Sequence, residues 1–144
     1  MTIDSNMVIL FDRYNLPEDV YEIIFATKQQ IIVAKLLLEM IKDHGGEITK
    51  TEMSLFATKL HEGNLITDQI DEPPYQGKKV KISYNKRQFY DRILTPMKSM
   101  GLIDYDMYKK TYRISTKFKD DMMRIGIMWA EESRKPARTL KLKK

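Results

Sequence analysis

The stretch from residue 78 to residue 115 constrains the fold of this chain most, because it combines high positive charge with two kinds of periodicity. Residues 78–113 carry ten basic and three acidic side chains, a net charge of +7. Over 102–105 and 111–114 the pattern alternates, as in two short antiparallel strands. Before them, apolar residues recur at helical spacing: Tyr90, Ile93, Leu94, Met97 and Met100. The sequence therefore predicts a basic helix followed directly by a basic β-hairpin.

Capping residues mark both ends of this helix. Asn85 lies three residues before Gln88, the spacing of a capping box, and Gly101 is typical of the residue after a helix. Pro96 interrupts the pattern, because a proline inside a helix removes a hydrogen bond and clashes with the preceding turn. Thr95 can cap a new helix in front of that proline. We therefore expect a kink or a second helix start there.

A basic helix followed by a basic hairpin resembles the recognition helix and wing of a winged helix-turn-helix domain. The sequence from Leu94 through Met97 to Gly101 and residues 102–103 resembles that family's junction between the recognition helix and the wing. There, two apolar residues one turn apart anchor the recognition helix, and a Gly-apolar-apolar step begins the wing. The resemblance covers residues 28–116. It implies a mainly α-helical fold with a small antiparallel β-hairpin, which binds double-stranded DNA.

A short helix is expected to begin near Pro17, with Asn15 as a possible cap. Two longer helices follow it before the basic stretch. Residues 28–43 show the strongest helical pattern, with Thr27 as a cap and glycines after the end. In the resemblance this is the first helix, and Glu47–Ile48 is the short strand beside the wing. Thr49 and Glu52 then mark the start of a helix that ends at about residue 61.

The segment between this helix and the basic helix is longer than the family's usual turn of a few residues. About twenty residues separate Leu60 from Asn85. Residues 62–77 contain acids, two prolines and a glycine, so no regular element is expected there. Residues 80–84 alternate like a strand, which predicts an inserted hairpin or an additional sheet edge.

These patterns divide the chain into four parts. Residues 1–27 form an N-terminal extension, and residues 28–116 form the winged-helix domain. Residues 117–135 form a C-terminal helix whose apolar face is expected to cover the first helix or to pair with a second copy. Residues 136–144 have the composition of a disordered basic tail.

Positive charge is concentrated in two blocks. Residues 1–77 have a net charge of −7 and residues 114–133 of −1, whereas residues 134–144 add +6 to the +7 of residues 78–113. Such blocks repel themselves, and a polyanion would relieve that repulsion. The chain has no cysteine and no apolar run long enough to span a membrane, which favours a cytoplasmic, nucleoid-associated protein.

The helix over about 85–100 and the wing over about 102–115 carry the candidate DNA contacts. DNA binding needs cations that replace counterions and polar side chains aimed at base edges. Arg87 and Arg92 are the best candidates for guanine edges or phosphates. Asn85 and Gln88 are equally suited to capping and to reading adenine. The full candidate set is Asn85, Lys86, Arg87, Gln88, Arg92, Thr95, Lys109, Lys110 and Arg113.

We therefore expect a sequence-specific double-stranded DNA-binding protein, a homodimeric transcription regulator. Two alternatives stay open. In the first, the module binds protein as a subunit of a larger nucleic-acid-associated assembly, and docks through its acidic first half and the apolar run Met7–Phe11. In the second, the protein is a DNA replication or plasmid maintenance factor. No membrane partner and no small-molecule ligand is indicated.

Nothing in the sequence indicates catalysis. His44 and His61, the two histidines, each lie at a predicted helix end, where the helix dipole favours them. No glycine-rich phosphate loop is present, and no cofactor or metal is expected. A nucleophilic tyrosine of a DNA-processing enzyme would need a histidine pair that holds a metal, which the sequence does not offer. The tyrosines considered for that role are Tyr84, Tyr90, Tyr105 and Tyr108.

Overall fold

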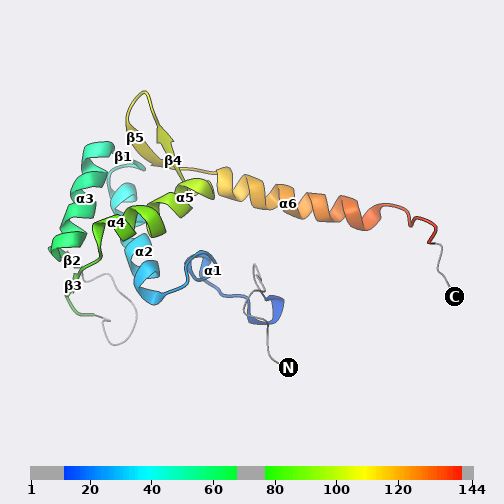
Figure 1. Ribbon diagram of the computed structural model, residues 1–144, viewed down its shortest axis with the longest axis horizontal. Helices are drawn as coiled ribbons and strands as arrows, with labels where there is room; N and C mark the ends of the chain where they lie inside the picture. The colour runs from blue at the N-terminus through cyan, green and yellow to red at the C-terminus, as the bar shows by residue number, and fades with distance from the viewer. Residues whose placement is uncertain (1–11, 68–76, 141–144) are drawn as a thin grey trace.

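The computed structural model describes residues 12–67 and 77–140, and it shows a helical body from which one long helix projects (Figure 1). The apolar run Met7–Phe11 lies outside the described residues. The body is mainly α-helical with small antiparallel sheets, which confirms the predicted class at this level. None of the helices in the described ranges is both long and apolar enough to cross a membrane.

The centre of the body is helix α2 (Lys28–Asp43), which has the predicted bounds. The Thr27 hydroxyl caps it by accepting the amide N–H of Gln30 at 3.2 Å. Its inner face is apolar and fully enclosed. The buried residues on this face are Ile31, Val33, Ala34, Leu37 and Ile41.

Helix α3 (Lys50–Glu62) starts with the predicted capping box, in which Thr49 and Glu52 exchange both hydrogen bonds. Gly63 ends it with φ 69°. Its inner side buries Met53, Phe56 and Leu60 against the core.

The basic helix is one continuous run of three segments: α4 (Lys86–Gln88), a π-helical segment η2 (Phe89–Leu94) and α5 (Thr95–Ser99). The prediction of Thr95 as a new cap is wrong, because its backbone is helical and no side-chain cap is made at the start of α5. The amide of Thr95 instead bonds to the oxygen of Tyr90, five residues back. This wider turn accommodates Pro96, which has no N–H to give.

A three-stranded sheet closes one end of the body in the order β1-β5-β4. Its strands are β1 (Glu47–Thr49), β4 (Ile103–Asp106) and β5 (Thr111–Ile114). Tyr112 of β5 lies between Ile48 and Tyr105 in the antiparallel register. The predicted hairpin and the predicted short strand beside it are therefore both present.

A second, two-stranded sheet pairs β2 (Leu65–Thr67) with β3 (Val80–Ile82). This is the inserted hairpin that the alternation over 80–84 predicted. The prediction that residues 62–77 hold no regular element is wrong at Leu65–Thr67. A strand of three residues is too short to show a period, and only its partner defines it.

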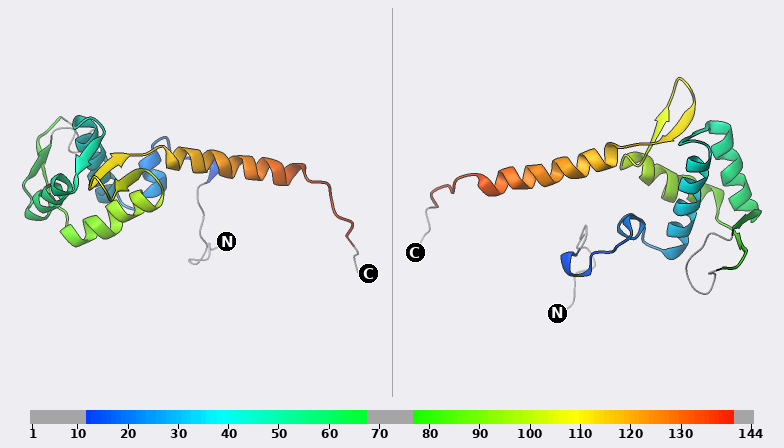
Figure 2. Two further views of the ribbon diagram at one scale, coloured as in Figure 1. Left: turned by 90° about the horizontal axis from the view of Figure 1, so that it is seen from above. Right: turned by 180° about the vertical axis from the view of Figure 1, so that it is seen from behind.

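Helix α6 (Lys117–Arg134) points away from the body in all three views (Figures 1 and 2). No residue of α6 is buried. The alternative in which this helix covers the first helix is therefore wrong.

Preceding α2 are a short 3-10 turn η1 (Arg13–Asn15) and helix α1 (Val20–Ile24), which Asp19 caps.

Candidate nucleic-acid interface

Burial alternates along the basic helix, so that the helix presents one polar face to solvent. Phe89, Ile93, Leu94 and Met97 are buried in the core. The exposed positions from residue 87 to residue 95 are Arg87, Gln88, Asp91, Arg92 and Thr95. We call these five residues the exposed helical face. Four of them belong to the candidate set derived from the sequence.

The two arginines of this face keep their charge accessible. The Arg87 side chain is 91% exposed, and its Nε lies 3.8 Å from Asp91 Oδ2, one helical turn away. An exposed pair at this separation contributes little and breaks readily. Arg92 makes no ion pair with any described residue. Both guanidinium groups are therefore available to a ligand.

Asn85 and Gln88 differ in their roles. The Asn85 side chain accepts the amide N–H of Gln88 at 3.1 Å, so Asn85 is a cap. Of the two uses expected for Asn85, capping is the one that the structure shows. The Gln88 side chain is exposed and makes no hydrogen bond to the described residues. Its amide remains suited to a base edge.

Lys86, a member of the candidate set, is directed toward α3. Its Nζ donates to the hydroxyl of Thr58 at 3.1 Å. Its amide N–H donates to Nδ1 of His61 at 3.1 Å. Lys86 therefore fixes the start of the basic helix against α3 and is not part of the exposed helical face.

His61 has a role that the sequence did not indicate. The expectation was a histidine stabilised by the dipole at the end of α3. Its ring in fact accepts a hydrogen bond from the following basic helix, 25 residues later in the chain. Only the close approach of the two helix ends creates this contact.

The turn of the β4–β5 hairpin is a second exposed basic site. Lys109 and Lys110 are exposed, and Tyr108 beside them is 98% exposed. Asp106 Oδ1 holds the turn by accepting the amide N–H groups of Tyr108 and Lys109, at 2.9 and 3.0 Å. The hydrogen bond from Lys109 is the main cause that lowers the pKa of Asp106. A structured turn thus presents two lysines and an aromatic ring to solvent.

Arg113 lies at the base of this hairpin in an ionic cluster. Its Nη2 is 3.8 Å from Asp104 Oδ2, and Lys117 Nζ is 2.9 Å from the same oxygen. Lys117 is the closer partner of that carboxylate, so Arg113 is only weakly engaged. Its half-exposed side chain remains available at the edge of the sheet.

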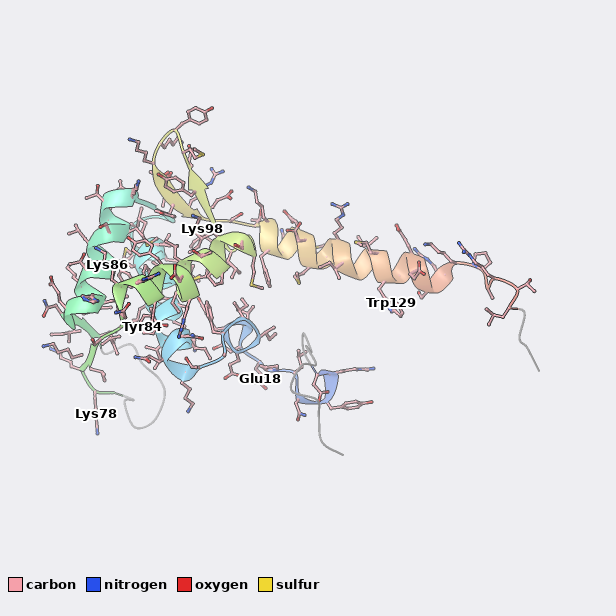
Figure 3. All side chains as sticks on the ribbon, viewed as in Figure 1. Glu18, Lys78, Tyr84, Lys86, Lys98 and Trp129 are labelled. Carbon is pink, nitrogen blue, oxygen red and sulfur yellow. The ribbon has the colours of Figure 1, made fainter. Side chains whose placement is uncertain are left out.

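Lys98 connects the basic helix with the hairpin. Its Nζ lies 5.7 Å from the ring centre of Tyr105 and 5.9 Å from that of Tyr112. Those two rings pack together with centroids 4.6 Å apart. A cation over aromatic faces stabilises this arrangement, which places the end of α5 beside the sheet (Figure 3). The sequence placed Lys98 in the basic stretch without assigning it this role.

The basic residues from 78 to 113 do not form one surface. Lys78, Lys79 and Lys81 belong to the β2–β3 hairpin, which follows the C-terminal end of α3. The three-stranded sheet lies at the N-terminal end of the same helix. Thirteen residues of α3 separate the two sites by about 20 Å, and Figure 3 shows Lys78 far from Lys98.

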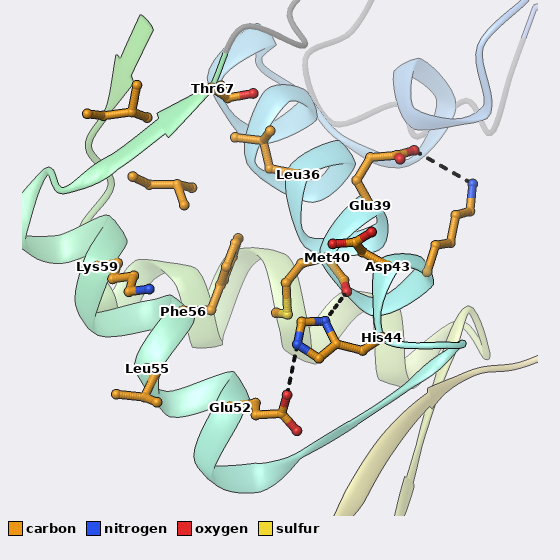
Figure 4. A pocket seen from close by; sticks show the side chains of 13 residues that line it. Leu36, Glu39, Met40, Asp43, His44, Glu52, Leu55, Phe56, Lys59 and Thr67 are labelled. Atoms are coloured by element: carbon orange, nitrogen blue, oxygen red, sulfur yellow. Dashed lines mark hydrogen bonds and ion pairs between the residues drawn. The ribbon is translucent and has the colours of Figure 1, made fainter. Parts of the chain in front are cut away.

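The opposite side of α3 carries an open groove between α2, α3 and β2 (Figure 4), with a volume of about 880 Å³. Its apolar lining includes Leu36, Met40 and Phe56. At its rim, His44 Nδ1 donates to the backbone oxygen of Met40 at 2.8 Å, and Nε2 lies 3.0 Å from Glu52 Oε2. His44 is therefore a helix-terminal residue, as expected from its position.

Three of the four tyrosines considered as nucleophiles are at least partly buried. Tyr84 is buried in the core, and Tyr90 and Tyr105 are partly buried and packed against it. Within residues 12–67 and 77–140, no three His, Cys, Asp or Glu side chains are placed to hold a metal ion. The exposed Tyr108 lies among lysines, with Asp106 as the nearby carboxylate.

No protein-family model matches this chain, and comparisons with curated proteins and with solved structures also find no match.

Proposed function

We propose that residues 28–116 form a winged helix-turn-helix domain that binds double-stranded DNA in a sequence-specific manner and regulates transcription. In this assignment α2 and α3 are the first two helices, and η2 with its flanking segments is the recognition helix. The β4–β5 hairpin is the wing. The order of elements supports the assignment, because a short strand between α2 and α3 pairs with the hairpin.

The observation that carries the proposal is the exposed helical face beside the basic hairpin. Arg87 and Arg92 are exposed on the helix and Lys109 and Lys110 on the hairpin turn. Lys98, packed over the two tyrosines of the sheet, links these elements. A helix fits the major groove, where arginine reads guanine edges. The hairpin lysines would contact phosphate or an adjacent minor groove.

The basic tail has a different task in this scheme. Residues 134–144 contain six basic residues and no acid. They add affinity through phosphates without choosing a sequence. The β2–β3 lysines lie too far from the wing to join one contact surface with it, although a long duplex could reach them.

A gel-mobility shift with a random-sequence duplex at several salt concentrations tests the proposal. The logarithm of affinity should fall linearly with the logarithm of salt, with a slope of roughly −0.9 for each phosphate neutralised. Deletion of residues 134–144 should flatten this slope and leave binding detectable. Absence of binding at low salt would contradict the proposal.

A second candidate is a protein-binding module, and the groove of Figure 4 favours it. Leu55 and Ile66 lie at that groove and are both more than half exposed. Exposed apolar side chains around a groove are a feature of docking sites. Salt-independent or absent DNA binding would favour this candidate over the first.

A further inference from the structure

Helix α6 exposes apolar side chains that the body leaves uncovered. It is 18 residues long, and none of its residues is buried. Trp129, the only tryptophan of the chain, is 71% exposed. In proteins, most of the stability of a helix comes from packing of its apolar face. The apolar side chains therefore require a partner.

The spacing of these residues indicates what the partner is. Phe118, Met122, Ile125 and Trp129 follow one another at intervals of four, three and four residues, which is the a/d spacing of a coiled-coil seam. All four therefore lie along one side of α6, which we call the α6 stripe. A seam of this kind fits the side of another helix.

We propose that the α6 stripe pairs with the α6 stripe of a second copy, with the two helices antiparallel. In this register Phe118 packs against Trp129 of the partner subunit, and Met122 packs against Ile125 of the partner subunit. The three exposed side chains, Met122, Ile125 and Trp129, are then covered on both copies, and the partly buried Phe118 is covered further. The contact is self-complementary, as a two-fold interface requires.

Charge favours the antiparallel direction. A parallel pair would bring together two C-terminal segments, each with six basic residues over 134–144 and no acid. An antiparallel pair separates these two segments and directs each one toward the partner's body, whose residues 1–113 have no net charge, −7 over 1–77 and +7 over 78–113. The repulsion between the two basic segments is thereby reduced without any change in the apolar contact.

Charge also argues against a membrane as the occupant of the stripe. Helices that lie on membranes have polar faces rich in lysine and arginine. Residues 114–133 contain four acids and three basic residues, a net charge of −1. A helix with this polar face gains little from an anionic lipid surface, whereas pairing with its own copy requires no net charge.

Pairing would give the protein two recognition helices related by a two-fold axis. This consequence rests on the proposed DNA binding, whereas the pairing itself does not. The preferred site would then be an inverted repeat. A single half-site would bind more weakly because only one domain could engage it.

Sedimentation equilibrium of the full chain without DNA tests the pairing. We expect the wild type to be a dimer at tens of micromolar, and Ile125→Asp to weaken dimerisation at least a hundredfold. The control is Ile127→Asp, because Ile127 lies two residues along the helix, off the stripe. The two isoleucines are 50% and 55% exposed in the single chain, so burial within it cannot explain a difference.

A circular dichroism spectrum with native helix content would show that each variant is folded, since α6 projects from the body. A monomeric wild type, or equal dimerisation of the two variants, would overturn the pairing. A wild-type protein that dimerises but does not bind DNA would overturn the proposed function and leave the pairing standing.

Disulfide trapping tests the direction of the helices. The chain has no cysteine, so any disulfide that forms must join the introduced thiols. A mixture of Phe118→Cys and Trp129→Cys chains should form a mixed disulfide on mild oxidation, because those positions face each other in the antiparallel register. Efficient disulfide formation by Phe118→Cys alone, with no mixed product, would overturn the antiparallel arrangement.

Discussion

The amide N–H of Phe118 donates a hydrogen bond to the backbone oxygen of Gly101 at 2.9 Å. Gly101 ends the basic helix, and Phe118 is the second residue of α6. One hydrogen bond thus joins the end of the proposed recognition helix to the start of the projecting helix. This contact ties the first turn of α6 to the body.

Replacement of Gly101 by alanine should destabilise the protein by about 2 kcal/mol or more. Its φ of +80° disfavours a side chain, at roughly 1–2 kcal/mol, and a Cβ would lie 2.9 Å from the amide nitrogen of Phe118. Urea denaturation measures the loss. Gly77→Ala is the control, because Gly77 has φ +73° and no atom of the described residues lies within 4 Å of the added Cβ. Equal losses in both variants would show that the close approach to α6 has no energetic importance.

His61→Ala should lower the free energy of unfolding by about 0.5–1.5 kcal/mol, because the amide of Lys86 loses its acceptor. The start of the basic helix should also become less ordered, which hydrogen exchange at Lys86 would show as faster exchange. His44→Ala is the control, since the hydrogen-bonding partners of its ring are Met40 of α2 and Glu52 of α3. Unchanged exchange at Lys86 in His61→Ala would show that His61 does not hold the helix.

The hairpin turn should be stable at neutral pH and lose order only in strong acid. The backbone hydrogen bond from Lys109 is the main cause that lowers the pKa of Asp106 below its usual 3.8. A lowered folded-state pKa contributes stability above the unfolded value, and this is lost as pH falls through the folded value. Amide chemical shifts of Tyr108 and Lys109 would follow this titration. The same shifts in Asp106→Asn should not move with pH in this range, and movement there would contradict the assignment.

Tyr21 should titrate last among the tyrosines whose pKa is shifted. Burial is the main cause that raises its pKa from 10.0 to about 12, and the charge of Asp19 adds to it. A raised folded-state pKa contributes stability that is complete below pH 10 and is lost as pH rises toward 12. Tyr21→Phe should therefore flatten the decline of stability in this alkaline range. An unchanged alkaline decline would show that burial of Tyr21 does not cause it.

Local sequence signals predicted the helices and the hairpin well. Lys28–Asp43 was predicted to the residue because Thr27 caps it and glycines follow it. The capping box of Thr49 and Glu52 likewise marked α3 correctly. These signals act over three or four residues, so no tertiary information was needed.

Features that depend on tertiary contact were missed. The pattern placed Tyr90 on the inward face of the basic helix. In the structure Phe89 is the fully buried ring, with its centroid 5.6 Å from that of Phe56. The π-helical turn shifts which residues face inward, and a period of 3.6 cannot reveal it. The orientation of Lys86 toward Thr58 was likewise missed, because its partner lies 28 residues away.

The most direct test of the account measures the affinity of Arg87→Ala/Arg92→Ala for a duplex that the wild type selects from a random pool. Each good arginine–guanine contact discriminates by about 1–3 kcal/mol, so affinity for the selected duplex should fall on the order of a hundredfold. Affinity for random duplex should fall far less. The matched control is Arg13→Ala/Arg124→Ala, which removes the same charge from exposed positions outside the interface. The account predicts near-normal binding by the control, and equal loss in the two double variants would contradict it.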